Sequence, residues 1–327
     1  MGRREWTVGV DFGATNIKVG LVSRQGKVVA NLILLTREHV TPAAFVDGVH
    51  QAIERLASRV GARRAQVRGV GVGAPGLIDA RRGIVHQLVN VRGGWRGVPL
   101  RRVLERRLRV PCAVDNDVNV VALGEWKFGA GKGTRHSVYL TLGTGVGGGL
   151  VMNGQLVRGA SGSAGEIGHM VIRPNGPRCA CGNRGCLESM VGTAAILRKA
   201  RRAIRARRRG ILARLATREQ GRLTPALVSR AARAGDQAAR RIWQELGEDL
   251  GLALANLVNL LSPQRIVIGG GMARAWPYFA PRLMATIREL AFEVPANACR
   301  IVRATLLDHA GIVGGAVLVW EQYGSRL

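Results

Sequence analysis

Three cysteines and a histidine lie close together in the sequence and are the side chains with the clearest chemistry. Cys179, Cys181 and Cys186 fall within eight positions, and His169 lies ten positions before the first of them. Thiolate sulfur and imidazole nitrogen are the ligands that Zn²⁺ prefers, and four of them complete a closed tetrahedral site. In a cytosolic chain this spacing favours a metal over disulfides. The sequence therefore predicts one metal site; buried, unpaired cysteines are the alternative.

Two glycine-rich turns follow predicted strands and could bind phosphate. The first is DFGATNIK, residues 11–18, and the second is LGTGVGGG, residues 142–149. Backbone N–H groups in such turns can cradle anionic oxygens, and Asp11 can hold Mg²⁺ directly or through water. The second turn lacks the Gly-Lys-Ser/Thr ending of a P-loop, and no helix follows it as in a dinucleotide fingerprint. A capped strand–turn–strand and a plain glycine hairpin are the alternatives.

An acidic cluster, Asp115-Asn-Asp117-Val-Asn119, lies between a predicted strand and a predicted helix. Such residues can serve only as helix caps. They can also supply a general base, because a hydroxyl that attacks phosphorus needs a positioned proton acceptor.

The order of predicted elements suggests one motif used twice. Strand, glycine loop and strand occur at residues 6–22 and again at 137–153, which predicts two related lobes that face a cleft. Residues 6–35 predict a β-meander, and apolar periodicity predicts helices elsewhere. Further strands are expected at 67–73, 110–114 and 150–154, and helices at 42–60, 99–108, 118–128, 246–261 and 312–323.

Composition limits the function classes. The chain has 327 residues, a net charge of +28 and a pI near 11.7, which invites a nucleic-acid interpretation. Arg, however, accounts for 44 of the 49 basic residues and is spread over the whole chain. The densest segment, 198–241, is predicted to be a solvated helical face with only incidental affinity for nucleic acid. Residues 1–10 lack a signal-peptide core, and no apolar run reaches the ~20 residues of a membrane span, so a cytoplasmic protein is expected.

These motifs, in this order, resemble the ROK family of bacterial sugar kinases and sugar-responsive repressors. The resemblance extends from Val8 to about Trp320, and the cysteine segment matches the family signature residue by residue. It implies an α/β protein with the actin-like ATPase (ribonuclease H-like) fold and an active-site cleft between two lobes. The lobes are expected at residues 1–117 and 118–311, with a last helix at about 312–327 that packs back on the first lobe.

The resemblance also implies a function for each motif. Asp117 would be the catalytic base of an ATP-dependent hexokinase that phosphorylates the 6-hydroxyl of a hexose, with glucose expected first. Zinc would be structural, ATP and Mg²⁺ the nucleotide and its metal, and the protein a homodimer or homotetramer. The implied sugar-binding residues are Gly76, Asn90, Asn116, Asp117, Glu166, His169 and Glu188. The implied nucleotide-binding residues are Asp11, Gly13, Thr15, Lys18, Thr144, Gly145, Gly269, Gly270 and Gly271.

Several alternatives stay open. Fructose, mannose, N-acetylglucosamine or N-acetylmannosamine could be the acceptor, and polyphosphate the donor. A repressor of the same family needs a DNA-binding segment before the ATPase-like body, for which we expect no room because the body starts by residue 8.

Overall fold

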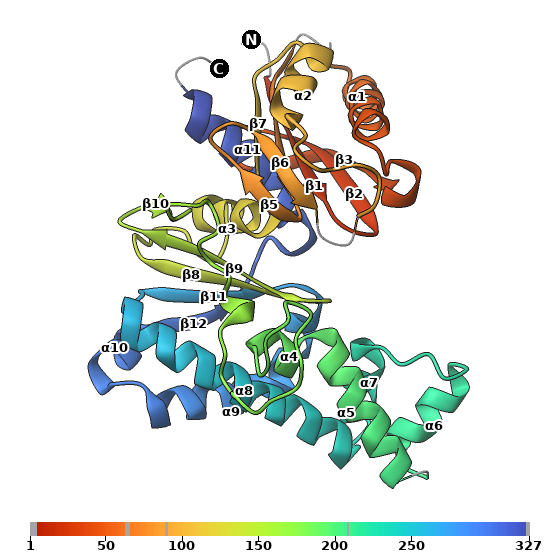
Figure 1. The fold of residues 1–327 in the computed structure, drawn as a ribbon, viewed down its shortest axis with the longest axis vertical. Helices are drawn as coiled ribbons and strands as arrows, with labels where there is room; N and C mark the ends of the chain where they lie inside the picture. The colour runs from red at the N-terminus through yellow and green to blue at the C-terminus, as the bar shows by residue number, and fades with distance from the viewer. Residues whose placement is uncertain (1–4, 63–65, 89–90, 208, 325–327) are drawn as a thin grey trace. The chain divides into compact units, whose positions relative to one another are not determined.

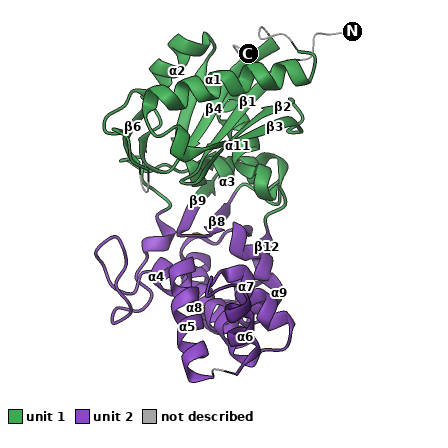
Figure 2. Cartoon of the chain, turned by 90° about the vertical axis from the view of Figure 1, so that its right-hand side faces the viewer, with its two compact units in different colours: residues 1–135, 149–165, 304–327 green, residues 136–148, 166–303 purple. Residues whose placement is uncertain are grey.

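The computed structural model describes the chain in four stretches, residues 5–62, 66–88, 91–207 and 209–324 (Figure 1). The chain folds into two compact units, coloured separately in Figure 2. Unit 1 is made of residues 1–135, 149–165 and 304–327, and unit 2 of residues 136–148 and 166–303. Within the described residues, no helix combines the length and the apolar character that crossing a bilayer requires.

Unit 1 is built on a five-stranded sheet with the order β3-β2-β1-β4-β7. The first three strands pair antiparallel, which confirms the predicted meander, whereas β1, β4 and β7 are parallel. The elements of this unit are β1 (Trp6–Phe12), β2 (Asn16–Val22), β3 (Val28–Leu35), η1 (Thr36–Glu38), α1 (Pro42–Arg59), β4 (Val67–Ala74), β5 (Gly76–Asp79), β6 (Ile84–Leu88), α2 (Leu100–Leu108), β7 (Cys112–Asn116), α3 (Asp117–Phe128), β10 (Gln155–Leu156), η5 (Leu307–His309) and α11 (Ala310–Tyr323).

Alternate residues of β1 face two different helix layers. Val8 and Val10 are fully buried in a core cluster with apolar residues of α1 and α2. Gly9, between them, faces α11, where a Cβ atom would lie 1.7 Å from the carbonyl oxygen of Ile312. Only glycine permits this approach, so α11 packs directly against the sheet. Because side chains alternate along a strand, Asp11 points to the same face as Gly9, toward the start of α11.

The division into units differs from the predicted lobe boundary at residue 117, because α3 belongs to unit 1. The physical reason is close packing between α3 and α11. A Cβ atom at Gly314 would lie 1.7 Å from the carbonyl oxygen of Val120, and one at Gly124 would lie 2.6 Å from that of Ala310. Glycines on both helices therefore let the two backbones meet, and α3 cannot separate from this unit without losing that contact.

A second sheet, with the order β10-β9-β8-β11-β12, contains three parallel strands of unit 2, β8, β11 and β12. Strand β9 passes into unit 1 at Gly149, and β10 returns beside it after Asn153 and Gly154, whose φ angles of 53° and 72° suit a type I′ hairpin. The sequence predicted a strand over 150–154, but β9 begins at Val146. Its glycines therefore lie within the strand rather than in the turn. At Gly149 the strand also passes close to α3, because a Cβ atom there would lie 2.7 Å from that of Ala122.

The remaining elements belong to unit 2, and its longest helix, α8, packs along α9. A Cβ atom at Gly247 of α8 would lie 2.3 Å from the carbonyl oxygen of Phe279 in α9, and Trp243 is fully buried. The bounds are β8 (Ser137–Leu142), β9 (Val146–Met152, shared with unit 1), η3 (Ile167–His169), α4 (Leu187–Val191), α5 (Thr193–Ala206), α6 (Ile211–Arg218), α7 (Pro225–Arg233), α8 (Gln237–Leu261), β11 (Arg265–Gly269), η4 (Gly271–Ala275), α9 (Trp276–Leu290), α10 (Glu293–Ala298) and β12 (Arg300–Arg303).

The arginine-rich segment 198–241 covers most of α5, all of α6 and α7, and the start of α8. Every arginine of this segment that the structure describes is exposed, which agrees with the predicted solvated face. The apolar residues of the same helices, such as Leu212 and Leu227, are buried.

Candidate active site and metal centre

The first phosphate motif forms the turn between β1 and β2. The N–H of Gly13 donates to the carbonyl oxygen of Asn16 at 3.0 Å. Thr36, after β3, ties the turn down twice, because its hydroxyl donates to the carbonyl oxygen of Gly13 at 2.7 Å and its N–H to that of Thr15 at 3.0 Å. These hydrogen bonds to backbone carbonyl oxygens therefore hold the turn in shape, while the Thr15 side chain stays exposed.

Asp11 is the carboxylate of this motif. Nζ of Lys18 lies 3.6 Å from its Oδ2 atom and also donates to the carbonyl oxygen of Asp308 at 3.3 Å. Burial raises the pKa of Asp11 above its ordinary value, an effect that Lys18 partly offsets. A partly desolvated carboxylate beside a phosphate-binding turn gains from a cation, and Mg²⁺ in proteins takes one or two carboxylates together with phosphate oxygens. The donor set therefore fits Mg²⁺.

Asn116 and Asp117 stand at the carboxyl end of β7, where α3 begins. Asn116 is the N-cap of the helix, since its Oδ1 atom accepts from the N–H of Val118 at 2.9 Å. Its Nδ2 atom donates to the carbonyl oxygen of Gly76 at 3.2 Å. Gly76 has a φ of 119°, which side chains rarely allow. Both ends of the Asn116 amide thus fix the start of α3, whose first residue is the half-buried Asp117.

The buried Asp115 and the half-buried Arg158 form a network that was not predicted from the sequence. Asp115 is 1% exposed, and its Oδ2 atom accepts from Nε and Nη2 of Arg158, both at 2.7 Å. Its Oδ1 atom accepts from the N–H of Asn116 at 2.7 Å and from Nδ2 of Asn119 at 3.1 Å. Asp115 follows an apolar run in the sequence, and a carboxylate buried there needs a hydrogen-bond or ion-pair partner. No local pattern could identify Arg158, which lies 43 positions away.

The predicted residues of unit 1 gather at one edge of its sheet. Since β1, β4 and β7 are parallel, their carboxyl ends lie along the same edge. That edge carries Asp11 on β1, Gly76 just after β4, and Asn116 with Asp117 at the end of β7. Ligands of open α/β sheets bind outside such carboxyl ends. Asn90, another predicted sugar contact, lies outside the described residues.

Two glycine turns of unit 2 also lie side by side, because β8 and β11 pair in parallel. Gly269 is the last residue of β11, and Gly270 follows with a φ of 84°. A Cβ atom at Gly270 would lie 2.4 Å from the carbonyl oxygen of Leu142, the last residue of β8. By contrast, a Cβ atom at Gly143 or Gly271 would meet nothing within 4 Å. Backbone at this edge is therefore open to a ligand such as a nucleotide.

Glu188, on α4, joins the second phosphate turn to the cysteine loop. Its Oε2 atom accepts from the N–H of Val146 at 2.9 Å, and its Oε1 atom lies 3.9 Å from Sγ of Cys179. A Cβ atom at Gly145 would come within 2.4 Å of Oε2, so a larger residue there would displace the Glu188 carboxylate, while Thr144 beside it is exposed. Sequence reasoning gave Glu188 only a sugar-binding role and missed this second contact.

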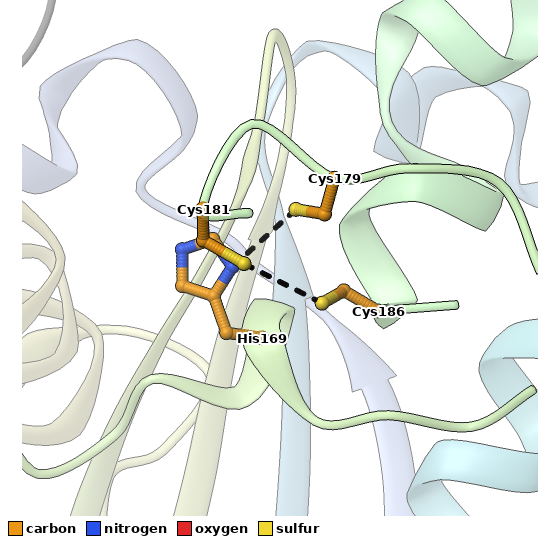
Figure 3. A group of neighbouring side chains, drawn as sticks. All are labelled: His169, Cys179, Cys181 and Cys186. Atoms are coloured by element: carbon orange, nitrogen blue, oxygen red, sulfur yellow. Dashed lines mark hydrogen bonds between the residues drawn. The ribbon is translucent and has the colours of Figure 1, made fainter. Parts of the chain in front are cut away.

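The four predicted metal ligands converge in unit 2 (Figure 3). Nδ1 of His169 lies 3.7 Å from Sγ of Cys179, and Sγ of Cys181 lies 3.6 Å from Sγ of Cys186. All four ligand atoms fall within 4.8 Å of one another. With Zn–S bonds of about 2.3 Å, two sulfurs of a tetrahedral site lie about 3.8 Å apart. The side chains are thus arranged as a tetrahedral ion requires.

Two thiols of this cluster have pKa values shifted in opposite directions. The backbone N–H of Asn183 lowers the pKa of the Cys181 thiol, whereas burial raises the pKa of Cys186 to about 12. A bound metal takes the place of such thiol protons. The second ring nitrogen of His169, Nε2, points away from the cysteines and lies 3.9 Å from Oε2 of Glu166. The ring therefore connects the metal ligands to an exposed carboxylate.

Comparison with known proteins identifies the family. The sequence model of the ROK family matches residues 7–322. The chain belongs to the ROK family. It is 37% identical over 321 residues to a glucokinase of Halalkalibacterium halodurans. The aligned residues cover 98% of this chain and 96% of that protein. It is 35% identical over 317 residues to a glucokinase of Thermotoga maritima, with coverage of 97% and 98%.

Solved structures agree with this assignment. The crystal structure of a ROK family glucokinase from Streptomyces griseus in complex with glucose and AMPPNP matches with a TM-score of 0.81 at 32% identity, over 96% of this chain and 98% of that one. The predicted actin-like ATPase fold is confirmed. Within this ROK protein, unit 1 carries Asp11 to Lys18, Gly76, Asn116 and Asp117, whereas unit 2 carries the second glycine turn and the metal ligands.

Proposed function

We propose that this ROK sugar kinase transfers the γ-phosphoryl group of ATP to the 6-hydroxyl of a hexose, with glucose as the preferred acceptor. The glucokinase relatives support the acceptor, and the relative bound to glucose and AMPPNP supports the pair of substrates. The observation that carries the proposal is the sheet edge of unit 1, on which a phosphate motif at Asp11 and an acid at the start of a helix, Asp117, are built on parallel strands.

Asp117 acts as the general base. Its carboxylate accepts the proton of the sugar 6-hydroxyl while that oxygen bonds to the γ-phosphorus and the bond to the departing ADP oxygen breaks. The Asn116 cap and the ion pair of Asp115 with Arg158 fix the residues just before it. A base held in this way needs little further ordering when the sugar binds. Further sugar contacts are assigned to Gly76, Asn90, Asn116, Glu166, His169 and Glu188.

The nucleotide is assigned to the two glycine turns and to the turn after β11. Asp11 would hold Mg²⁺ here, and the ion would supply positive charge that stabilises the transferred phosphoryl group. Lys18, 3.6 Å from Asp11, adds a positive charge at the same position. The assigned residues are Asp11, Gly13, Thr15, Lys18, Thr144, Gly145, Gly269, Gly270 and Gly271.

Zinc is assigned a structural role at His169, Cys179, Cys181 and Cys186. Four protein ligands fill a tetrahedral site and leave no open position for a substrate. The ion would hold the cysteine loop between His169 and α4, and so the residues Glu166, His169 and Glu188 at its two ends. Three reduced thiolates also suit the cytoplasm, our proposed compartment.

A homo-oligomer is part of the proposal, and an apolar patch of unit 2 supports it. Leu260, Leu290, Phe292 and Val294 are 49–81% exposed, and the N–H of Phe292 donates to Asn259 beside Leu260. Exposed apolar patches of this kind favour protein partners. The nearby Arg288, Glu289, Glu293 and Arg300 balance in charge, so two copies of a strongly basic chain could meet there. Light scattering of the wild type and of Phe292→Ser would give the mass of each.

A coupled assay over a small panel tests the function. Glucose, fructose, mannose, N-acetylglucosamine and N-acetylmannosamine are each offered with ATP or with polyphosphate. We expect the highest kcat/KM for glucose with ATP. A higher value for another sugar, or for polyphosphate, would replace that substrate in the proposal, and no turnover with any pair would overturn it.

A further inference from the structure

Glu125 is a buried carboxylate near the end of α3 for which the proposed reaction has no use. Its side chain is 1% exposed. Oε2 accepts from the N–H groups of Ala130 at 2.8 Å and Thr305 at 3.1 Å, and Oε1 accepts from the N–H of Leu306 at 2.7 Å. A buried carboxylate without hydrogen-bond partners is costly, so these hydrogen bonds hold it in place.

The donors flank two points at which the chain passes from one unit to the other. Ala130 lies in the segment that leads from α3 into unit 2, which begins at residue 136. Thr305 and Leu306 lie in the segment that returns from β12, since unit 1 resumes at residue 304. Space is tight as well, because a Cβ atom at Gly129 would lie 2.1 Å from Oε2 of Glu125. One carboxylate thus ties both segments to the end of α3.

The returning segment, residues 304–311, also contacts the first phosphate motif. The carbonyl oxygen of Asp308 accepts from Nζ of Lys18, and a Cβ atom at Gly311 would lie 2.6 Å from Cγ of Asp11. Residues 304–311 therefore run from Glu125 at one end to Asp11 and Lys18 at the other. The opposite end of α3 begins with Asp117.

We propose that Glu125 is a positioning residue for phosphoryl transfer. By holding residues 304–311 to α3, it keeps the phosphate motif at Asp11 in register with the base Asp117, which α3 itself carries. The contacts that link Glu125 through residues 304–311 to Asp11 all lie within unit 1. The inference rests on the proposed kinase function, because it assigns Asp11 to the nucleotide and Asp117 to the sugar hydroxyl.

The test is Glu125→Gln in the full-length enzyme. Glutamine has nearly the same volume, but in either orientation its NH₂ group faces a backbone N–H that needs an acceptor. Residues 304–311 should then shift, and misplacement of about 1 Å at a reacting group costs on the order of 10²-fold. We expect kcat to fall about 10- to 10²-fold and the KM for ATP to rise, as a small displacement predicts. Glucose binding, measured by calorimetry without nucleotide, should change less than about two-fold, because no proposed sugar contact touches Glu125.

Asp236→Asn is the matched control. Asp236 is 8% exposed, and its carboxylate accepts from the N–H groups of Leu212 at 2.8 Å and Ala239 at 2.9 Å. The same acid-to-amide change is thus made at a buried carboxylate of unit 2 that contacts no residue of the proposed site. We expect both variants to lower the melting temperature, and only Glu125→Gln to lower kcat.

A second variant, Gly129→Ala, keeps the carboxylate but pushes a methyl group against Oε2 and Cα of Glu125, and we expect the same loss of kcat with wild-type glucose affinity. If Glu125→Gln and Gly129→Ala have lower melting temperatures but keep wild-type kcat and KM for ATP, Glu125 is only a structural residue and the inference is overturned. A wild-type enzyme that phosphorylates no hexose would instead overturn the proposed function, so the two failures are distinguishable.

Discussion

The acidic edge of unit 1 and the cysteine loop of unit 2 both present polar side chains, but they are held in different ways. At the edge, Asp115 is 1% exposed and all its hydrogen bonds come from within the unit. In the loop, Cys179 is the only buried residue between positions 171 and 184, a stretch that the structure describes in full and that contains no helix or strand. The first region is fixed by a packed core, whereas the second has little core of its own. The metal ion that we propose would cross-link this loop.

The largest effect should come from breaking the chemistry of the well-packed edge without breaking its structure. Asp117→Asn keeps the shape of the side chain but removes the proposed proton acceptor. We expect a fall in kcat of about 10²–10⁴-fold, the usual contribution of a general base. The melting temperature and glucose affinity should stay close to wild type, because the network around Asp115 is unchanged. A variant that keeps near-normal kcat would show that another group is the base.

The next effect should come from removing the metal from the loop. Cys181→Ser replaces a thiolate by a poor zinc ligand. The zinc content, measured by elemental analysis, should therefore fall from about one zinc per chain to a small fraction of that. Heat stability and kcat/KM for glucose should fall together, because Glu166, His169 and Glu188 depend on the loop.

Cys299→Ser is the control for the metal variant, since Cys299 is half-buried and lies outside the cluster. It should keep its zinc and its activity. If metal-free Cys181→Ser is fully active and equally stable, the loop does not need an ion, and the contrast between the two regions is wrong.

The two regions also differ in how far sequence alone could describe them. The metal ligands lie within 18 positions, so their spacing predicted a cluster in which they converge. The strands that carry Asp11 and Asn116 were likewise predicted from local apolar runs, although β7 ends at Asn116, beyond the predicted range 110–114. Partners distant in sequence were not, because hydrogen bonds such as that of Glu125 with Thr305, 180 positions apart, depend on tertiary packing. The lobe boundary at residue 117 missed the packing of α3 on α11 for the same reason.

The smallest effect on turnover should come from the arginine-rich segment, which belongs to neither region. Arg205, Arg207 and Arg209 are exposed, and no assigned substrate contact lies among them. Exposed arginines attract polyanions by releasing counterions, so binding of nucleic acid or polyphosphate should weaken steeply with salt. With about 6–10 phosphate contacts, affinity should fall about 10³–10⁵-fold between 50 and 200 mM salt.

Replacing these three arginines by glutamine should therefore reduce polyanion binding and flatten its dependence on salt, while ATP-dependent turnover changes less than about two-fold. The control removes the same charge from exposed arginines of unit 1, Arg37, Arg82 and Arg102. It separates an effect of net charge from an effect of this surface, because both variants lose three charges. A collapse of turnover at unchanged stability in the first variant alone would make the segment part of the active machinery. If polyphosphate then proves the faster donor and only the first variant loses that activity, the arginines bind the donor, and our choice of ATP is wrong.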